Sequence, residues 1–233
     1  MIVDTMSHAE VYQELERDRE AISTWWHHNL NNQRRRVLKS TRFPVQLWFE
    51  YTSPRRNRYY FYTRIYEKRM RRILTGIIVI RQGKDGMTVY TNWLGHQKLI
   101  APMVLTPHMW RQYQLRCNIQ KSGIELIKHY LEQNPQGKDS DNQHVVGRSV
   151  RYNGEEHQSC CVPEGVLLGQ VHDGIYLVKT FITYDMCCGR QQQEFEHCRS
   201  QIIGDDELYA RERVWYDKPY NYYENYQPGS IIM

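Results

Sequence analysis

The residues with the clearest capacity for chemistry lie in one short segment, for which the sequence predicts a helix over about residues 106 to 117. Thr106 can cap this helix, and Pro107 suits its first turn. His108 and Arg116 are eight residues apart, so they can share a face about 12 Å apart along the axis. A neutral imidazole can accept a proton near pH 7, and a guanidinium can hold a phosphate through two hydrogen bonds.

Arg111 and Gln112 lie between these two residues, and either could complete a polar stripe with them. A base, a cation and a hydrogen-bond donor are the parts that an RNA-cleaving site needs for the 2′-hydroxyl and the phosphate. The other interpretation is structural. In that case His108 is a helix-start histidine satisfied by backbone or water, and Arg116 is a surface cation near a helix end.

The segments after this helix add a resemblance to a known family. Ser122 and Glu125 open a second predicted helix that ends near Gln133, and a β-meander follows that contains Glu164-Gly165-Val166-Leu167-Leu168-Gly169 and a closing strand, Asp173 to Thr183. Over about residues 104 to 186 this order resembles the barnase–RelE-like toxin ribonucleases. The resemblance implies that His108, Arg116 and Thr180 bind and activate a scissile phosphate without metal or other cofactor, with Thr183 as a neighbouring candidate.

A second feature is a strongly basic stretch from Arg34 to Arg72, which holds thirteen Lys or Arg and only two Glu. Within it, the run Arg58-Tyr59-Tyr60-Phe61-Tyr62-Thr63-Arg64 alternates cations with aromatic rings. Cations beside stacking rings are typical of proteins that hold single-stranded nucleic acid. The residues predicted to bind nucleic acid are Arg34, Arg35, Arg36, Arg55, Arg56, Arg58, Arg64 and Arg111. An acidic protein partner, or a solvated sheet face with Arg over the rings, would also fit.

These segments must be positioned by a fold that the pattern predicts to be α+β. We expect an N-terminal helix, a basic antiparallel sheet, a central helix pair, a second antiparallel sheet, and a C-terminal helix with a Tyr-rich tail. The expected helices cover 7–32, 106–117, 122–133 and 190–203, and the expected strands 45–52, 58–66, 73–81, 87–93, 144–152, 157–162, 165–171 and 175–184. The expected domains are 1–95 for the first helix and sheet, 96–204 for the toxin-like core, and 205–233 for the tail.

Composition limits the other classes of function. The chain has 18 Tyr against 5 Phe, which favours contact surfaces, and the tyrosines of the tail indicate a protein partner there. The N-terminus lacks a signal-peptide pattern and the chain lacks a long apolar run, so we expect a cytoplasmic protein without membrane contact. The six Cys form no C-x-x-C pair, and the group Cys187, Cys188, His197 and Cys198 is an awkward zinc alternative, so no metal or cofactor is expected.

Two functions therefore remain open on the sequence. The first is an RNA-associated protein with a toxin-like core that acts as a metal-independent endoribonuclease through His108, Arg116 and Thr180. The alternative is a non-catalytic nucleic-acid-binding or assembly protein of a phage or mobile genetic element. In both cases RNA is the expected partner, ahead of DNA.

Overall fold

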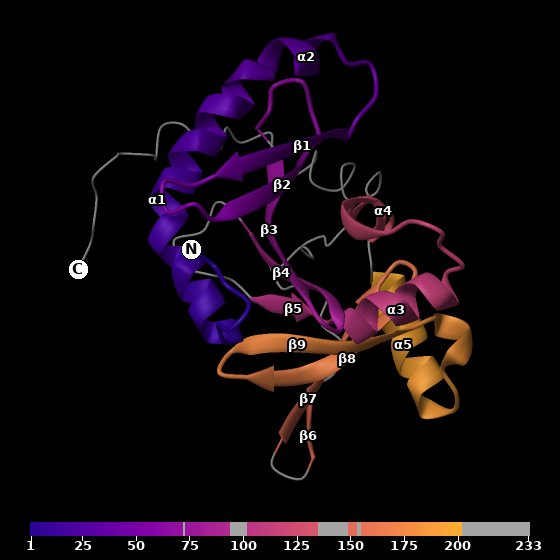
Figure 1. The fold of residues 1–233 in the computed structure, drawn as a ribbon. Helices are drawn as coiled ribbons and strands as arrows, with labels where there is room; N and C mark the ends of the chain where they lie inside the picture. The colour runs from indigo at the N-terminus through magenta and orange to yellow at the C-terminus, as the bar shows by residue number, and fades with distance from the viewer. Residues whose placement is uncertain (72, 94–101, 135–148, 153–154, 202–233) are drawn as a thin grey trace, which may run out of the picture.

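The structure is a computed structural model that describes residues 1–71, 73–93, 102–134, 149–152 and 155–201 (Figure 1). Within these ranges the strands form a single sheet of nine, in the order β1-β2-β3-β4-β5-β9-β8-β7-β6. Helices cover both faces of this sheet, so the molecule is built in three layers. The predicted α+β class is confirmed.

The elements have the following bounds. The helices are α1 (His8–Asn32), α2 (Arg34–Lys39), α3 (Pro107–Arg116), α4 (Gly123–Gln133) and α5 (Arg190–Gln201), with a short 3₁₀ turn η1 (Tyr184–Met186). The strands are β1 (Val45–Thr52), β2 (Arg58–Ile65), β3 (Ile73–Gly83), β4 (Gly86–Trp93), β5 (Met103–Leu105), β6 (Ser149–Tyr152), β7 (Glu155–Val162), β8 (Gly165–His172) and β9 (Ile175–Ile182).

The sheet consists of two antiparallel meanders joined by β5. Strands β1 to β4 follow one another in antiparallel pairs, and so do β6 to β9. The short strand β5 is antiparallel to β4, with Leu105 opposite Val89, and parallel to β9, with Leu105 beside Val178. The two sheets expected from the sequence are thus one sheet, and its hydrogen bonds cross the expected boundary between residues 95 and 96.

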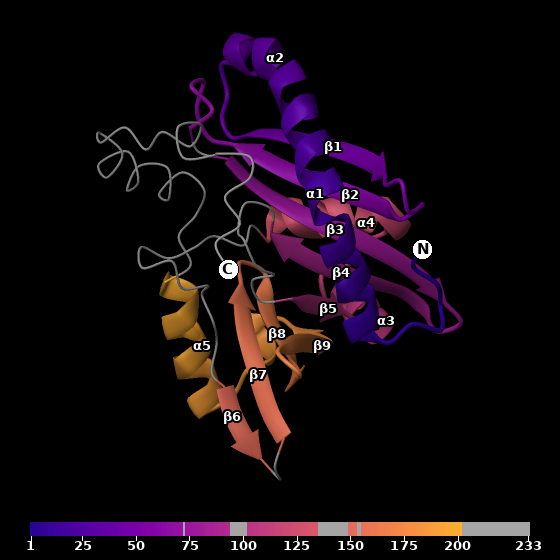
Figure 2. The same ribbon diagram turned by 90° about the vertical axis from the view of Figure 1, so that its left-hand side faces the viewer.

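Each face of the sheet carries its own apolar core. On one face α1 buries Val11, Leu15 and Ile22 against β1 to β4, and α5 covers β7 and β8 through Phe195. On the other face α3 and α4 bury a second core that includes Met109, Trp110, Tyr113, Leu126 and Ile127. Figure 2 shows α1 crossing the strands of the first meander and α5 lying beside the second.

The helix ends follow the capping patterns in the sequence. Ser7 forms a capping box with Glu10 at the start of α1, and the Thr106 side chain accepts a hydrogen bond from the Met109 amide at the start of α3. At the end of α4, the Asn134 amide donates to Glu164 in the turn between β7 and β8. The C-terminal end of α4 is therefore fastened to the turn between β7 and β8.

Candidate nucleic-acid interface

Two basic segments that are far apart in the sequence meet at one end of the sheet. Val45, the first residue of β1, lies opposite Ile65, the last residue of β2, and Ile65 pairs on its other side with Ile73, the first residue of β3. The connection from α2 into β1 and the turn from β2 into β3 therefore share this end, and both views show them together (Figures 1 and 2). We call this end the basic pole; its exposed cations are Arg34, Arg35, Arg36, Lys39, Arg42, Lys68, Arg69 and Arg71.

The first lobe of the basic pole is α2 with the connection to β1. Val37 is fully buried in the α1-side core and holds this short helix in place. At about 100° per residue, Arg35 and Lys39 point directly away from Val37, and they are separated by about 6 Å along the axis. Arg34 and Arg36 flank them, so the outer surface of α2 is mostly cationic, with Leu38 as its exposed apolar residue.

The second lobe is the turn between β2 and β3. Met70 is buried in the same core as Val37, and its φ of 53° puts its backbone in the left-handed region. Its amide donates to the Glu67 carbonyl at 3.0 Å, which closes the turn. The neighbours Arg69 and Arg71 are exposed on either side of this anchor.

The charge of the basic pole is poorly balanced locally. Its eight exposed cations share the two segments with a single carboxylate, Glu67, which is half-buried. Among described residues, none of the eight forms an ion pair. Mutual repulsion of this kind lowers stability and is relieved by binding a polyanion.

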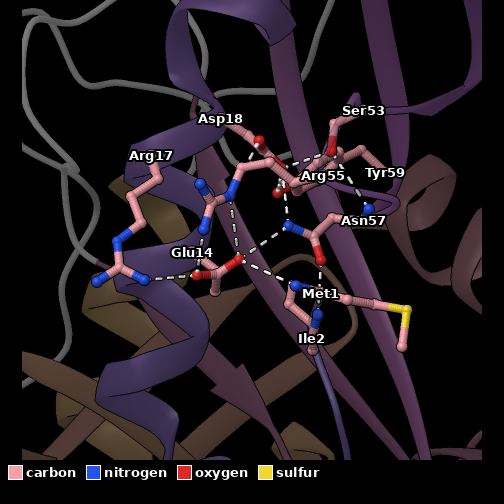
Figure 3. Close-up of polar contacts among 9 residues, drawn as sticks. All are labelled: Met1, Ile2, Glu14, Arg17, Asp18, Ser53, Arg55, Asn57 and Tyr59. Carbon is pink, nitrogen blue, oxygen red and sulfur yellow. Dashed lines mark hydrogen bonds and ion pairs between the residues drawn. The ribbon is translucent and has the colours of Figure 1, made fainter.

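Arg55 was predicted to bind nucleic acid, but it belongs to a buried polar network under the turn between β1 and β2 (Figure 3). Its guanidinium donates to the Glu14 carboxylate at 3.1 and 3.4 Å and lies 3.8 Å from Asp18. Both carboxylates project from α1 and are almost completely buried. Arg55 is therefore a structural counter-ion.

The same network fastens α1 to the first hairpin. The Asp18 carboxylate accepts hydrogen bonds from Ser53 at 2.6 Å, Asn57 at 2.8 Å and Tyr59 at 2.7 Å. The Glu14 carboxylate also contacts Arg17, Asn57 and the Met1 ammonium. The hydrogen bonds from Arg55 and Arg17 hold the pKa of Glu14 at about 2, against an ordinary value of 4.5. Because both carboxylates of α1 accept hydrogen bonds from the β1–β2 hairpin, the cluster fixes this helix against the sheet.

Arg58 and Arg64, which were also predicted to bind nucleic acid, both have partners within the protein. Arg58 forms an ion pair with Glu50 on the neighbouring strand and lies over the ring of Tyr60. Arg64 is 1% exposed, and it donates to the Tyr62 hydroxyl and to the carbonyls of Leu131 and Glu132 in the last turn of α4. Its charge is therefore used at a helix C-terminus, and the prediction that Arg64 binds nucleic acid is corrected.

Arg56 is exposed, but it sits in the turn between β1 and β2, at the end of β1 away from the basic pole. Because β1 has eight residues, its two ends are roughly 24 Å apart. Of the residues predicted to bind nucleic acid, only Arg34, Arg35 and Arg36 belong to the basic pole.

The aromatic rings of the first meander are covered on both faces of the sheet, contrary to the expectation of an open stacking surface. Tyr59 and Phe61 are buried against α1, whereas Tyr62 is buried on the side of α4. Every Tyr, Trp and Phe whose exposure is described is buried or half-buried. Aromatic residues occur on both faces of β2 because each face packs against a separate apolar core.

The residues of the predicted ribonuclease site are placed on different surfaces. His108 is exposed on α3, on the side away from the buried Trp110 and Tyr113. Arg116 lies about 80° around the helix from His108 and donates to the Phe181 carbonyl of β9. Thr180 pairs with Leu168, which packs on the α5 side, whereas α3 covers the opposite face. The structure does not bring the three side chains together.

The α3 helix also lies far from the basic pole. The Pro107 side chain is against Gly86 in the turn between β3 and β4, and Arg111 donates to the Asp85 carbonyl in that turn. The basic pole is at the other end of β3, eleven residues away, which is roughly 35 Å along the strand. One short RNA segment bound at the basic pole would not reach His108.

The remaining predictions concern thiols, metals and membranes. Burial raises the pKa of the Cys117 thiol to about 11, with Glu164 and Asp185 adding to the shift. Within the described ranges, no cluster of His, Cys, Asp and Glu has the makings of a metal site. Among the helices of those ranges, none combines the length and apolar character needed to cross a bilayer. The side chains of His197 and Cys198, and the tail from 205 to 233, lie outside the description.

Comparison with protein families, curated proteins and solved structures returned no match for this chain. The toxin-like resemblance of residues 104 to 186 therefore stays a prediction.

Proposed function

We propose that this protein binds RNA through the phosphates of its backbone, using the basic pole, and that it does so without cleaving the RNA. The observation that carries this proposal is the convergence of α2 and the turn between β2 and β3, which gathers eight exposed cations around one carboxylate. RNA was the partner expected from the sequence, ahead of DNA.

The charge arrangement supports backbone contact. Each Lys or Arg that neutralises a phosphate releases a condensed counter-ion, so binding strengthens steeply as the salt concentration falls. Side chains that already have ionic partners contribute little to such binding, and this removes Arg55 and Arg58 from the interface. The cations of the basic pole have no such partners among described residues, so they remain available for phosphates.

The placement of the predicted catalytic residues supports a non-catalytic role. Cleavage through a 2′-hydroxyl needs a base and a cation within hydrogen-bonding reach of the same phosphate. His108 faces solvent, Arg116 is engaged with a main-chain carbonyl, and Thr180 is on the far face of the sheet. The basic pole, where the substrate would be held, lies at the other end of β3.

The proposal is tested by measuring RNA affinity as a function of salt for matched variants. Arg35→Gln with Lys39→Gln removes two charges from the basic pole, whereas Arg56→Gln with Lys84→Gln removes two exposed charges elsewhere. The pole variant should lower the slope of log K against log salt by about 2, and the control should leave it unchanged. Equal losses in both variants, or salt-insensitive binding by the unmodified protein, would count against the basic pole.

A further inference from the structure

We infer that the basic pole binds double-stranded RNA, with its two lobes on the two phosphate rows that border one groove. This inference rests on the proposed RNA-binding function and deepens it, because it names the form of RNA. It assigns α2 to one row of phosphates and the turn between β2 and β3 to the other, which the sequence did not indicate.

The first step is the separation of the lobes. The α2 lobe enters the sheet at Val45, and the turn lobe spans the next two strands, at Ile65 and Ile73. Neighbouring strands lie about 4.8 Å apart, so the lobes are rooted roughly 5 to 10 Å from one another. In A-form RNA two phosphate rows border a narrow major groove, so two cation sets rooted this close together suit the rows on either side of it.

The second step is the rigidity of the lobes. Val37 under α2 and Met70 under the turn are both buried in the α1-side core, so each lobe has an apolar anchor in the same body. A stiff duplex presents its phosphates at fixed spacings, and a surface that is already ordered loses little conformational entropy on binding it. A flexible single strand would not require two cation sets held at a set distance.

The third step is the state of the aromatic rings. Proteins that hold single strands combine cations with accessible rings on which bases stack. Here Trp48 packs on Tyr62 at 4.8 Å with Lys128 above it, and Trp25 stacks on Tyr51 at 4.7 Å. These rings are engaged with the protein itself. At the basic pole, Tyr66 is buried and Phe43 packs against the α1-side core, so phosphates are the groups that the pole can contact. Double-stranded RNA is recognised largely through its phosphates, its 2′-hydroxyls and its shape.

The test compares a 20-base-pair RNA duplex with each of its component strands, chosen to lack internal pairing, in fluorescence anisotropy titrations at several salt concentrations. Three proteins accompany the unmodified one. They carry Arg35→Gln with Lys39→Gln in the α2 lobe, Lys68→Gln with Arg69→Gln in the turn lobe, and Arg56→Gln with Lys84→Gln as the control. Circular dichroism and thermal melting establish that each variant is folded.

The duplex should bind at least tenfold more tightly than either strand at equal salt, and each lobe variant should lower the duplex salt slope by about 2. The inference is overturned if a single strand binds as tightly as the duplex, or if either lobe variant binds the duplex like the control. RNA binding with a single-strand preference would reject the inference about double-stranded RNA but not the proposed RNA-binding function. Binding of neither form would reject the proposed function together with the inference.

Discussion

Val45 and Ile65 lie directly opposite one another at the end of the β1–β2 ladder. This pairing brings the cations that precede β1 beside those that follow β2, although the two groups are separated by more than twenty residues in the sequence. Residues of one sign that repel one another are usually dispersed over a surface. Their collection at one end, with a buried anchor under each group, is the basis of the proposed RNA-binding role.

Replacing His108 with Ala should leave both RNA binding and RNA integrity unchanged. The side chain is exposed and lies roughly 35 Å along β3 from the basic pole. Labelled RNA incubated with either protein in the presence of a chelator should remain intact in a denaturing gel. Cleavage by the unmodified protein that disappears in His108→Ala would restore the toxin-like enzyme.

Arg64→Met should destabilise the protein by about 2–4 kcal/mol without altering the salt slope of RNA binding at temperatures where the variant is folded. The change leaves the last carbonyls of α4 and the Tyr62 hydroxyl without their buried donor. Urea unfolding measures the first effect. Arg58→Met, at an exposed ion pair, should lower stability far less than Arg64→Met. An Arg64→Met protein of normal stability but weaker RNA binding would contradict the structural assignment.

Glu14→Gln should lower stability at pH 6 by roughly 2–3 kcal/mol, because the network in Figure 3 loses its charged acceptor. The folded pKa of about 2 lies below the ordinary 4.5, so the carboxylate stabilises the fold above pH 4.5. That contribution is lost as the pH falls from 4.5 towards 2. The stability gap between the two proteins should therefore close over this range in urea titrations.

The exposed carboxylate Glu20 on the same helix provides the control for this titration. Glu20→Gln should change stability by less than about 0.5 kcal/mol at pH 6. A gap between Glu14→Gln and the unmodified protein that stays constant from pH 6 to pH 3 would show that Glu14 is not the titrating group.

Gly169→Ala should destabilise the fold by about 3 kcal/mol, since a Cβ there would lie 2.1 Å from the Leu177 carbonyl oxygen in the adjacent strand. Gly174→Ala is the matched control: its φ of +74° costs about 1 kcal/mol, but nothing within 4 Å obstructs the methyl group. Thermal melting of the two variants checks the register of β8 and β9. Equal destabilisation would contradict the close approach of β9 to Gly169 beside the register shift between Leu168 and Gly169.

Much of the local structure could be predicted from the sequence, because capping and alternation are local signals. The Ser7 capping box and the Thr106-Pro107 start placed α1 and α3 within a residue or two of their observed bounds. The strand β5 was missed because three residues carry no readable period, and this strand is the one that joins the two meanders. The six-residue helix α2 was missed for a similar reason.

The candidate site was predicted less well, because charge and residue type do not reveal burial or strand order. The run from Arg58 to Arg64 reads as an open cationic face, yet Arg64 is buried under α4 and Tyr59 under α1. His108 and Thr180 suit one active site by type. The register shift between Leu168 and Gly169 places Thr180 on the α5 side of the sheet, whereas α3, which carries His108, covers the opposite face. Which cations gather at one end depends on strand pairing over long sequence separations.

The central claim is tested most directly by the salt dependence of RNA binding in a protein that lacks four charges of the basic pole: Arg35→Gln, Lys39→Gln, Lys68→Gln and Arg69→Gln together. A control protein loses four exposed cations elsewhere, through Arg56→Gln, Lys84→Gln, Lys121→Gln and Arg199→Gln. The pole protein should lose about 4 from the slope of log K against log salt, whereas the control should keep the slope of the unmodified protein. Equal slopes in the pole protein and the unmodified protein would contradict the account.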